Sequence, residues 1–103
     1  MGDATINNIT PANYGSSASQ ALEVILDCNE FGRNPVEVWA KSSAAATFTV
    51  SCSRNGVDYR TADTIALAAA GEELRVYDNA YRFIKVATTA ANNNEIEIAA
   101  GRE

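Results

Sequence analysis

Few residues of this 103-residue chain are of the types that catalyse reactions or bind metals. The chain has no histidine, which excludes a Ser-His or Cys-His nucleophile pair and removes the commonest metal ligand. Two cysteines are present, but they do not form the C-x-x-C spacing that is typical of zinc sites. We therefore predict no catalytic residues, no metal site and no cofactor, and we expect that the protein is not an enzyme.

The two cysteines, Cys28 and Cys52, occupy apolar positions of segments that alternate between apolar and polar residues. A disulfide between them would require Cα atoms roughly 4.4–6.8 Å apart, which facing or neighbouring strands can supply. Buried free thiols are the usual state in a reducing compartment. Both states remain open from the sequence, and free thiols are favoured.

Carboxylates and aromatic rings are the other side chains that could form a site. Glu72-Glu73 and Glu95/Glu97 are acidic pairs, but their spacing fits the solvent side of strands. A glycosidase would need two carboxyl groups that face each other across a cleft, and nothing in the pattern indicates one. Trp39 and Tyr59 could stack on a sugar ring, although such rings more often cover the edge of a core or an interface.

Composition limits the partners. Thirteen acidic and eight basic residues give a net charge of −5, which argues against binding to nucleic acid. The longest apolar run, Ile65–Ala70, is far shorter than the ~20 residues of a membrane span. No basic, then apolar, leader opens the chain, so we expect synthesis in a cytoplasm and no membrane partner.

Alternation with a period of two dominates the chain from residue 20 onward and predicts β-strands. The strongest local signal is Asn55-Gly56 between two alternating segments, because both residues tolerate the positive φ of a hairpin turn. A helix over 62–70 is an alternative that the alanines allow. About eight short strands are expected, at 22–28, 36–41, 47–53, 57–60, 64–67, 74–77, 82–88 and 96–98.

These strands predict an all-β fold, an antiparallel β-sandwich of jelly-roll type with an extended N-terminal arm. One parity of each strand should form the core between two sheets. The predicted core residues are Leu22, Val24, Leu26, Val36, Val38, Phe48, Val50, Leu74, Val76, Ile84, Val86, Ile96 and Ile98.

Residues 1–19 form the predicted arm, and residues 20–103 the β-sandwich domain. The arm is rich in Asn, Ser, Thr and Gly, with Pro11, and has little to bury. It is either a disordered tail or an extended segment that orders against a neighbouring subunit. In the second case Ile9 and Tyr14 would be its anchors.

Two segments carry a family resemblance. Residues 48–59, FTVSCSRNGVDY, resemble the discoidin-like hairpin F-x-V-x-x-S-x-D-G-x-x-W, with Asn55 for the Asp and Tyr59 for the Trp. Residues 81–86, YRFIKV, and 94–98, NEIEI, are similar to two later strands of that galactose-binding-like family. The resemblance implies a jelly-roll sandwich and transfers no ligand residue. The chain also resembles small structural proteins of tailed-phage particles.

Together these features favour a virion structural protein of a tailed phage, made in the host cytoplasm and acting as a capsid decoration (cement) protein. Its partners would be proteins, either the capsid lattice or further copies in a homo-oligomer. The alternative is a discoidin-like carbohydrate- or surface-binding module, with a glycan as partner. The expected interface residues are Ile9, Tyr14, Trp39, Tyr59 and Tyr81, since Trp and Tyr are enriched at interface hot spots.

Overall fold

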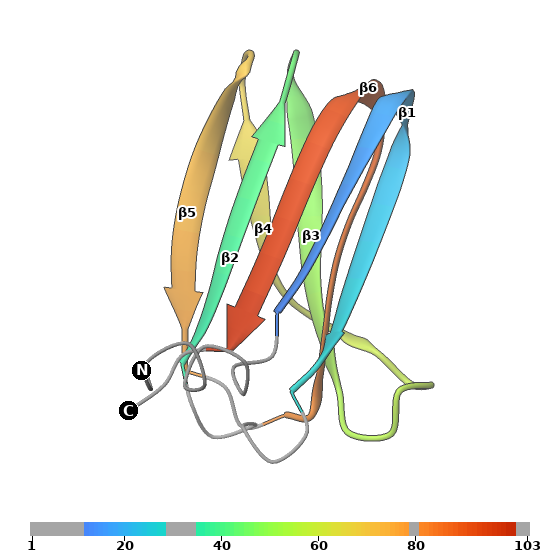
Figure 1. The fold of residues 1–103 in the computed structure, drawn as a ribbon, viewed down its shortest axis with the longest axis vertical. Helices are drawn as coiled ribbons and strands as arrows, with labels where there is room; N and C mark the ends of the chain where they lie inside the picture. Colours follow the sequence, from blue (N-terminus) through green and yellow to red (C-terminus); the bar gives the residue numbers. More distant parts are fainter. Residues whose placement is uncertain (1–11, 29–34, 79–80, 101–103) are drawn as a thin grey trace, which may run out of the picture.

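The computed structural model describes residues 12–28, 35–78 and 81–100, which form an all-β fold of antiparallel strands without helices (Figure 1). The strands are β1 (Ala12–Asp27), β2 (Val36–Ser42), β3 (Ala46–Ser53), β4 (Arg60–Leu67), β5 (Gly71–Tyr77) and β6 (Phe83–Ala100). They pair in a single six-stranded sheet that nearly closes on itself like a barrel.

Two long strands, β1 and β6, pair with each other along most of their length and take part in both halves of the fold. Residues 94–100 of β6 lie between residues 12–17 of β1 and strand β2, and β5 lies beyond β2. Residues 83–87 of β6 lie between the second half of β1 and strand β3, and β4 lies beyond β3. We call these halves the β2–β5 sheet and the β3–β4 sheet.

The strand pair passes from one half to the other through an irregular corner. The register of β1 against β6 shifts on both sides of Gln20, and Ser19 has a φ of 56°. The amide of Asn94, which is fully buried, donates to Ser17 Oγ at 3.2 Å and to the Gln20 carbonyl at 2.9 Å. Its Oδ1 accepts a hydrogen bond from Ser42 Oγ at 2.8 Å. This amide joins β1, β2 and β6 at the corner.

The core lies between the inner faces of the two halves. Phe48 and Ile65 come from the β3–β4 sheet, and Ile96 and Ile98 from the β2–β5 sheet, and all four are fully buried. Alternation places the core residues of β6 on even positions along the whole strand. Of the thirteen predicted core residues ten are buried, and Leu22 is partly buried against the core.

Leu74 and Val76 were predicted in the core, and this prediction is wrong. They are 58% and 60% exposed, because the register pairs Val38, which is buried, with Arg75 and so turns Arg75 inward. Paired residues of an antiparallel ladder share a face, so the residues on either side of Arg75 must point outward. The inner face of β5 is therefore polar.

Hydrogen bonds among Asp63, Arg75 and Tyr77, which we call the polar clasp, explain why Arg75 points inward. Arg75 Nη1 lies 2.9 Å from Asp63 Oδ2 and donates to the Thr64 carbonyl at 3.1 Å, and the Tyr77 hydroxyl donates to the same Asp63 oxygen at 2.8 Å. Burial and this bond raise the pKa of Tyr77 to about 12. The clasp links β4 to β5 across the gap between the two edge strands.

Strand boundaries differ from the predictions in three places. The segments expected at 82–88 and 96–98 belong to one strand, β6. Residues 57–59 lie in the connection between β3 and β4 rather than in a strand, and residues 60–67 form β4 where a helix was the alternative. The architecture is the predicted sandwich, built from six strands of which two are long.

The predicted boundary of the arm has to be corrected. Residues 12–19 are extended, as expected, but they belong to β1, and residues 12–17 pair with residues 94–99 of β6. Backbone hydrogen bonds fix this segment, although none of its side chains is buried in the core. A deletion of residues 2–19 would therefore remove part of a strand. Ile9 and the rest of residues 1–11 lie outside the described residues.

Ile84 and Leu74 test the assignment of faces as a matched pair. Ile84→Ala should lower the free energy of unfolding by ~2–5 kcal/mol, because Ile84 is 2% exposed and its loss leaves a cavity. Leu74→Ala, at a 58% exposed site, should change the free energy of unfolding by less than ~1 kcal/mol. Urea denaturation measures both. Equal losses for the two variants would contradict the register of β5.

The clasp predicts a pH dependence. Hydrogen bonds from Tyr77 and from the Thr64 backbone, with a smaller contribution from Arg75, lower the pKa of Asp63. The stabilisation is present above the pKa of the unfolded chain and is lost as the pH falls through the lower pKa of the folded state. The stability difference between the natural chain and Asp63→Asn should therefore shrink on acidification below about pH 4. Denaturation curves at several pH values measure it, and a difference that does not change with pH would refute the clasp.

Candidate functional site

The outer face of the β2–β5 sheet carries an ordered grid of side chains, which follows from the strand registers. Each row crosses β1, β6, β2 and β5 in that order. The first row is Ala12, Ala99, Glu37 and Val76; the second is Tyr14, Glu97, Trp39 and Leu74; the third is Ser16, Glu95, Lys41 and Glu72. We call this surface the Trp39 face.

Apolar side chains on the Trp39 face are unusually open to solvent. Tyr14 is 53% exposed, and Leu74 and Val76 are 58% and 60% exposed. Among the described residues only two other large apolar side chains are exposed, Ile25 and Val57. Trp39, Leu74 and Val76 adjoin on β2 and β5, whereas Glu97 separates them from Tyr14. Exposed apolar area gathered on one face of a small protein often marks a binding surface.

Hydrogen bonds fix the two aromatic rings of this face. Trp39 Nε1 donates to Glu72 Oε1 at 2.7 Å, and the Tyr14 hydroxyl donates to Glu95 Oε1 at 2.8 Å. The bond to Glu95 is also the main reason that the pKa of Tyr14 is raised. One strand, β6, separates β1 from β2, so the two backbones lie roughly 10 Å apart.

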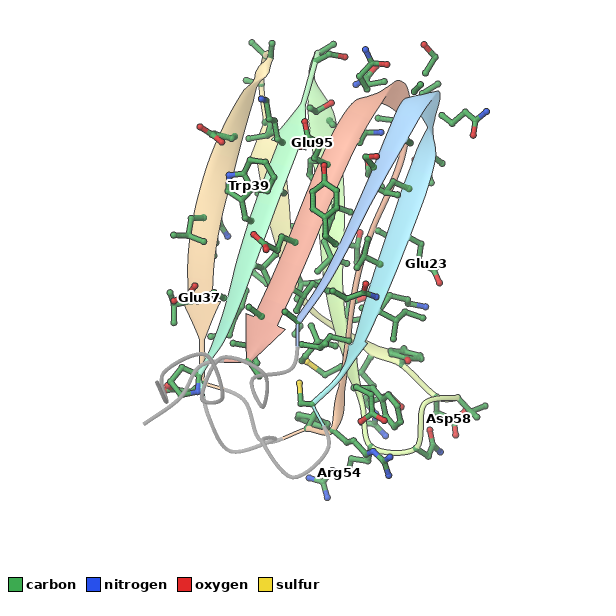
Figure 2. The ribbon with its side chains drawn as sticks, viewed as in Figure 1. Glu23, Glu37, Trp39, Arg54, Asp58 and Glu95 are labelled. Carbon is green, nitrogen blue, oxygen red and sulfur yellow. The ribbon has the colours of Figure 1, made fainter. Side chains whose placement is uncertain are left out.

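The Trp39 face is acidic as well as apolar. It carries four glutamates and one lysine: Glu37, Glu72, Glu95, Glu97 and Lys41. Figure 2 shows Trp39, Glu37 and Glu95 along the β2–β5 sheet, away from the end of the molecule where Arg54 and Asp58 lie. The face therefore attracts positively charged groups.

The second feature is the loop of residues 54–59, which protrudes between β3 and β4 (Figure 1). Ser53 Oγ accepts the backbone N–H groups of Asn55 and Gly56, at 3.2 and 2.9 Å. Asn55 Oδ1 accepts those of Val57 and Asp58, at 2.8 and 2.9 Å. Gly56 has a φ of 79°, which confirms the predicted turn residue within a longer loop than a two-residue hairpin. Val57 is 78% exposed.

A cleft of about 380 Å³ lies beside this loop. Its lining residues are Cys52, Ser53, Arg54, Asn55, Asp58, Arg60 and Tyr81. The Arg54 guanidinium lies 5.1 Å from the centre of the Tyr81 ring, a cation–π contact. Burial raises the pKa of the Cys52 thiol, which disfavours the nucleophilic thiolate. No disulfide joins Cys28 and Cys52, and the thiol state is the one favoured from the sequence.

The predicted interface residues fall in two places. Tyr14 and Trp39 lie together on the Trp39 face. Tyr81 lines the cleft, and the Tyr59 ring lies 4.3 Å from Lys85 Nζ. Sequence reasoning missed Leu74 and Val76 as surface residues. The alternation of β5 with Glu73 and Arg75 indicates the opposite face, so only the pairing of β5 with β2 could have identified them.

Metal and membrane features are absent from the part of the chain that the structure describes. No group of Cys, Asp and Glu side chains within residues 12–28, 35–78 and 81–100 has the arrangement of a metal site. Over the same residues no helix is long and apolar enough to cross a membrane.

No protein family and no curated protein matches the sequence, but solved structures share its fold. The PBSX exported protein XepA is 16% identical with a TM-score of 0.68, over 89% of this chain and 38% of XepA. The chain therefore spans well under half the length of XepA. PirA is 10% identical, with a TM-score of 0.53 over 87% of this chain and 93% of PirA.

TmCBM61, solved in complex with β-1,4-galactotriose, is 12% identical with a TM-score of 0.53, over 91% of this chain and 70% of TmCBM61. These likenesses define the class of protein as a small all-β sandwich of jelly-roll type. At such low identity they show the fold alone.

Two glycines test the loop conformation as a matched pair. Gly56→Ala should lower the free energy of unfolding by ~1–2 kcal/mol, because a side chain at positive φ is strained and its Cβ would lie 3.2 Å from the Phe83 ring. Gly71→Ala should have a much smaller effect, since its Cβ would meet only the Ala69 carbonyl at 3.9 Å. Thermal melts compare the two, and an unchanged melting temperature for Gly56→Ala would contradict this turn.

Proposed function

We propose that the chain is a non-enzymatic virion structural protein of a tailed phage, a capsid decoration (cement) protein that binds its protein partner through the Trp39 face. The observation that carries the proposal is the exposure of Tyr14, Leu74 and Val76 on one ordered sheet surface. The fold shared with the phage-related XepA supports the assignment to a phage particle. The chain would be made in the host cytoplasm and function in the virion.

The Trp39 face combines aromatic rings, exposed apolar area and surrounding charges, which are features of protein interfaces. Trp39 and Tyr14 are rigid rings of the kind that form hot spots, and Leu74 beside Trp39 adds apolar area to bury. Burial of apolar surface contributes about 25 cal/mol per Å². The glutamates around the rings would fix the orientation of a partner that carries positive charge.

Co-sedimentation with purified phage particles tests this proposal. Leu74→Ser combined with Val76→Ser should remove most particle binding while leaving the melting temperature nearly unchanged, since both side chains are exposed. Ile25→Ser is the matched control, because Ile25 is 38% exposed on β1 where it pairs with β6 of the β3–β4 sheet. Full particle binding by the double variant, or no association of the natural chain with particles, would overturn the proposal.

A glycan is the second candidate partner, favoured by the two hydrogen-bonded rings. Trp39 and Tyr14 stand on one face with carboxylates beside them, and the fold resembles that of TmCBM61. Binding of galacto-oligosaccharides, measured by NMR titration, would then depend on Trp39 and Tyr14. Sugar binding that Trp39→Ala abolishes and Val76→Ser leaves intact would favour this candidate over the protein partner.

A further inference from the structure

We infer that the Trp39 face binds the loop end of a second copy, residues 54–60, so that the chains associate head to tail. The inference rests on the proposed function and specifies which surface of which partner covers the face. Three observations support it: the positions of the exposed apolar residues, the positions of arginines without an ion pair to a described residue, and the shape of the loop.

Four of the five exposed large apolar side chains among the described residues lie at two sites of the molecule. Tyr14, Leu74 and Val76 belong to the Trp39 face, and Val57, which is 78% exposed, belongs to the 54–59 loop. Each site leaves apolar area in water that contact with the other would bury. Ile25, on the opposite half of the fold, is the least exposed of the five.

The two sites carry complementary charge. The Trp39 face has four glutamates against one lysine. At the loop end, Arg54 and Arg60 bracket Val57 and form no ion pair with any described residue, whereas Arg75 and Arg82 are paired with carboxylates. The one carboxylate among the residues that line the cleft, Asp58, accepts a hydrogen bond from the Asn55 amide at 3.1 Å. The Arg54 guanidinium lies against the Tyr81 ring, and a guanidinium without a carboxylate partner can donate two hydrogen bonds to a glutamate.

The Trp39 face and the 54–59 loop of one copy cannot contact each other. The loop connects β3 and β4, whereas the Trp39 face is the outer surface of the other half of the fold. Figure 2 places Arg54 and Asp58 at one end of the molecule and Trp39 and Glu95 along the sheet. A second copy is therefore required.

The loop protrudes from the fold and can contact a second copy (Figure 1). Its backbone is fixed by the hydrogen bonds of Ser53 and Asn55, so little ordering entropy is lost when it binds. Leu74 and Val76 are two residues apart on β5, about 7 Å, and present a flat apolar surface to Val57. Such a contact joins different surfaces, so it leaves one face and one loop free on every pair and continues into a ring or a filament.

Two complementary variants test the inference in solution. The loop variant carries Val57→Ser, Arg54→Gln and Arg60→Gln, and the face variant carries Leu74→Ser, Glu37→Gln and Glu97→Gln. The control carries Ile25→Ser and Glu23→Gln, on the outer side of the other half. Analytical ultracentrifugation measures association over a range of concentrations. Single substitutions Val57→Ser and Leu74→Ser replace a triple variant that fails to fold.

The natural chain and the control should form concentration-dependent oligomers. Each variant alone should associate at least about tenfold more weakly. An equimolar mixture of the two variants should form one-to-one dimers and nothing larger, because only one intact loop can meet one intact face. A monomeric natural chain, variants that associate alone as strongly as the natural chain, or a mixture of the two variants that stays monomeric would overturn the inference.

The decoration role and the head-to-tail contact can be refuted independently of each other. If the natural chain is monomeric and the loop variant occupies phage particles at full level, the head-to-tail contact is wrong and the decoration role stands. If the natural chain forms head-to-tail oligomers but never accompanies particles, the decoration role is wrong and the contact stands.

Discussion

The long antiparallel pair of β1 and β6 belongs to both halves of the fold, and every other strand is placed by it. The pair must leave one sheet and enter the other without leaving backbone groups unbonded inside the protein. Asn94 meets this requirement, since its buried amide bonds Ser17, Gln20 and Ser42 around the corner. A buried amide without these partners would cost about 1–3 kcal/mol per missing bond, so the corner tolerates little variation.

Placing β1 and β6 in the middle leaves β4 and β5 as edges. Exposed edges invite pairing with other chains, and this protein limits that risk by joining the two edges through Asp63, Arg75 and Tyr77. The clasp turns Arg75 inward, and the alternation of the strand then forces Leu74 and Val76 outward. The exposed apolar surface of the Trp39 face is thus a consequence of how the sandwich is closed.

Much of this fold could be predicted from alternation alone, because the last part of β1 and strands β2, β3 and β6 have a clear apolar face. In β5 the alternation predicts Leu74 and Val76 in the core, and the opposite orientation depends on the bond of Arg75 to Asp63, which lies on another strand. Residues 12–19 have no buried apolar side chain, and backbone pairing of residues 12–17 with β6 holds them in place. The three asparagines at 92–94 resemble a turn in the sequence, but Asn94 is instead a buried link within a continuous strand.

Only part of the candidate site could be predicted from the sequence, because the site also depends on which strands pair. Tyr14 and Trp39 could be named as interface residues by their type, but their meeting on one face depends on β1 lying beside β6, which no local pattern encodes.

Charge determines how such a face can be used by a protein with a net charge of −5. Two copies repel each other at long range, but at physiological salt this repulsion fades within about 8 Å. The longest dimension of the molecule is 39 Å, so most of its charge does not act across a contact. Local groups therefore decide the orientation. Glutamates of the Trp39 face repel the same face of another copy and attract Arg54 and Arg60, which disfavours a symmetric face-to-face pair and favours contacts between unlike surfaces.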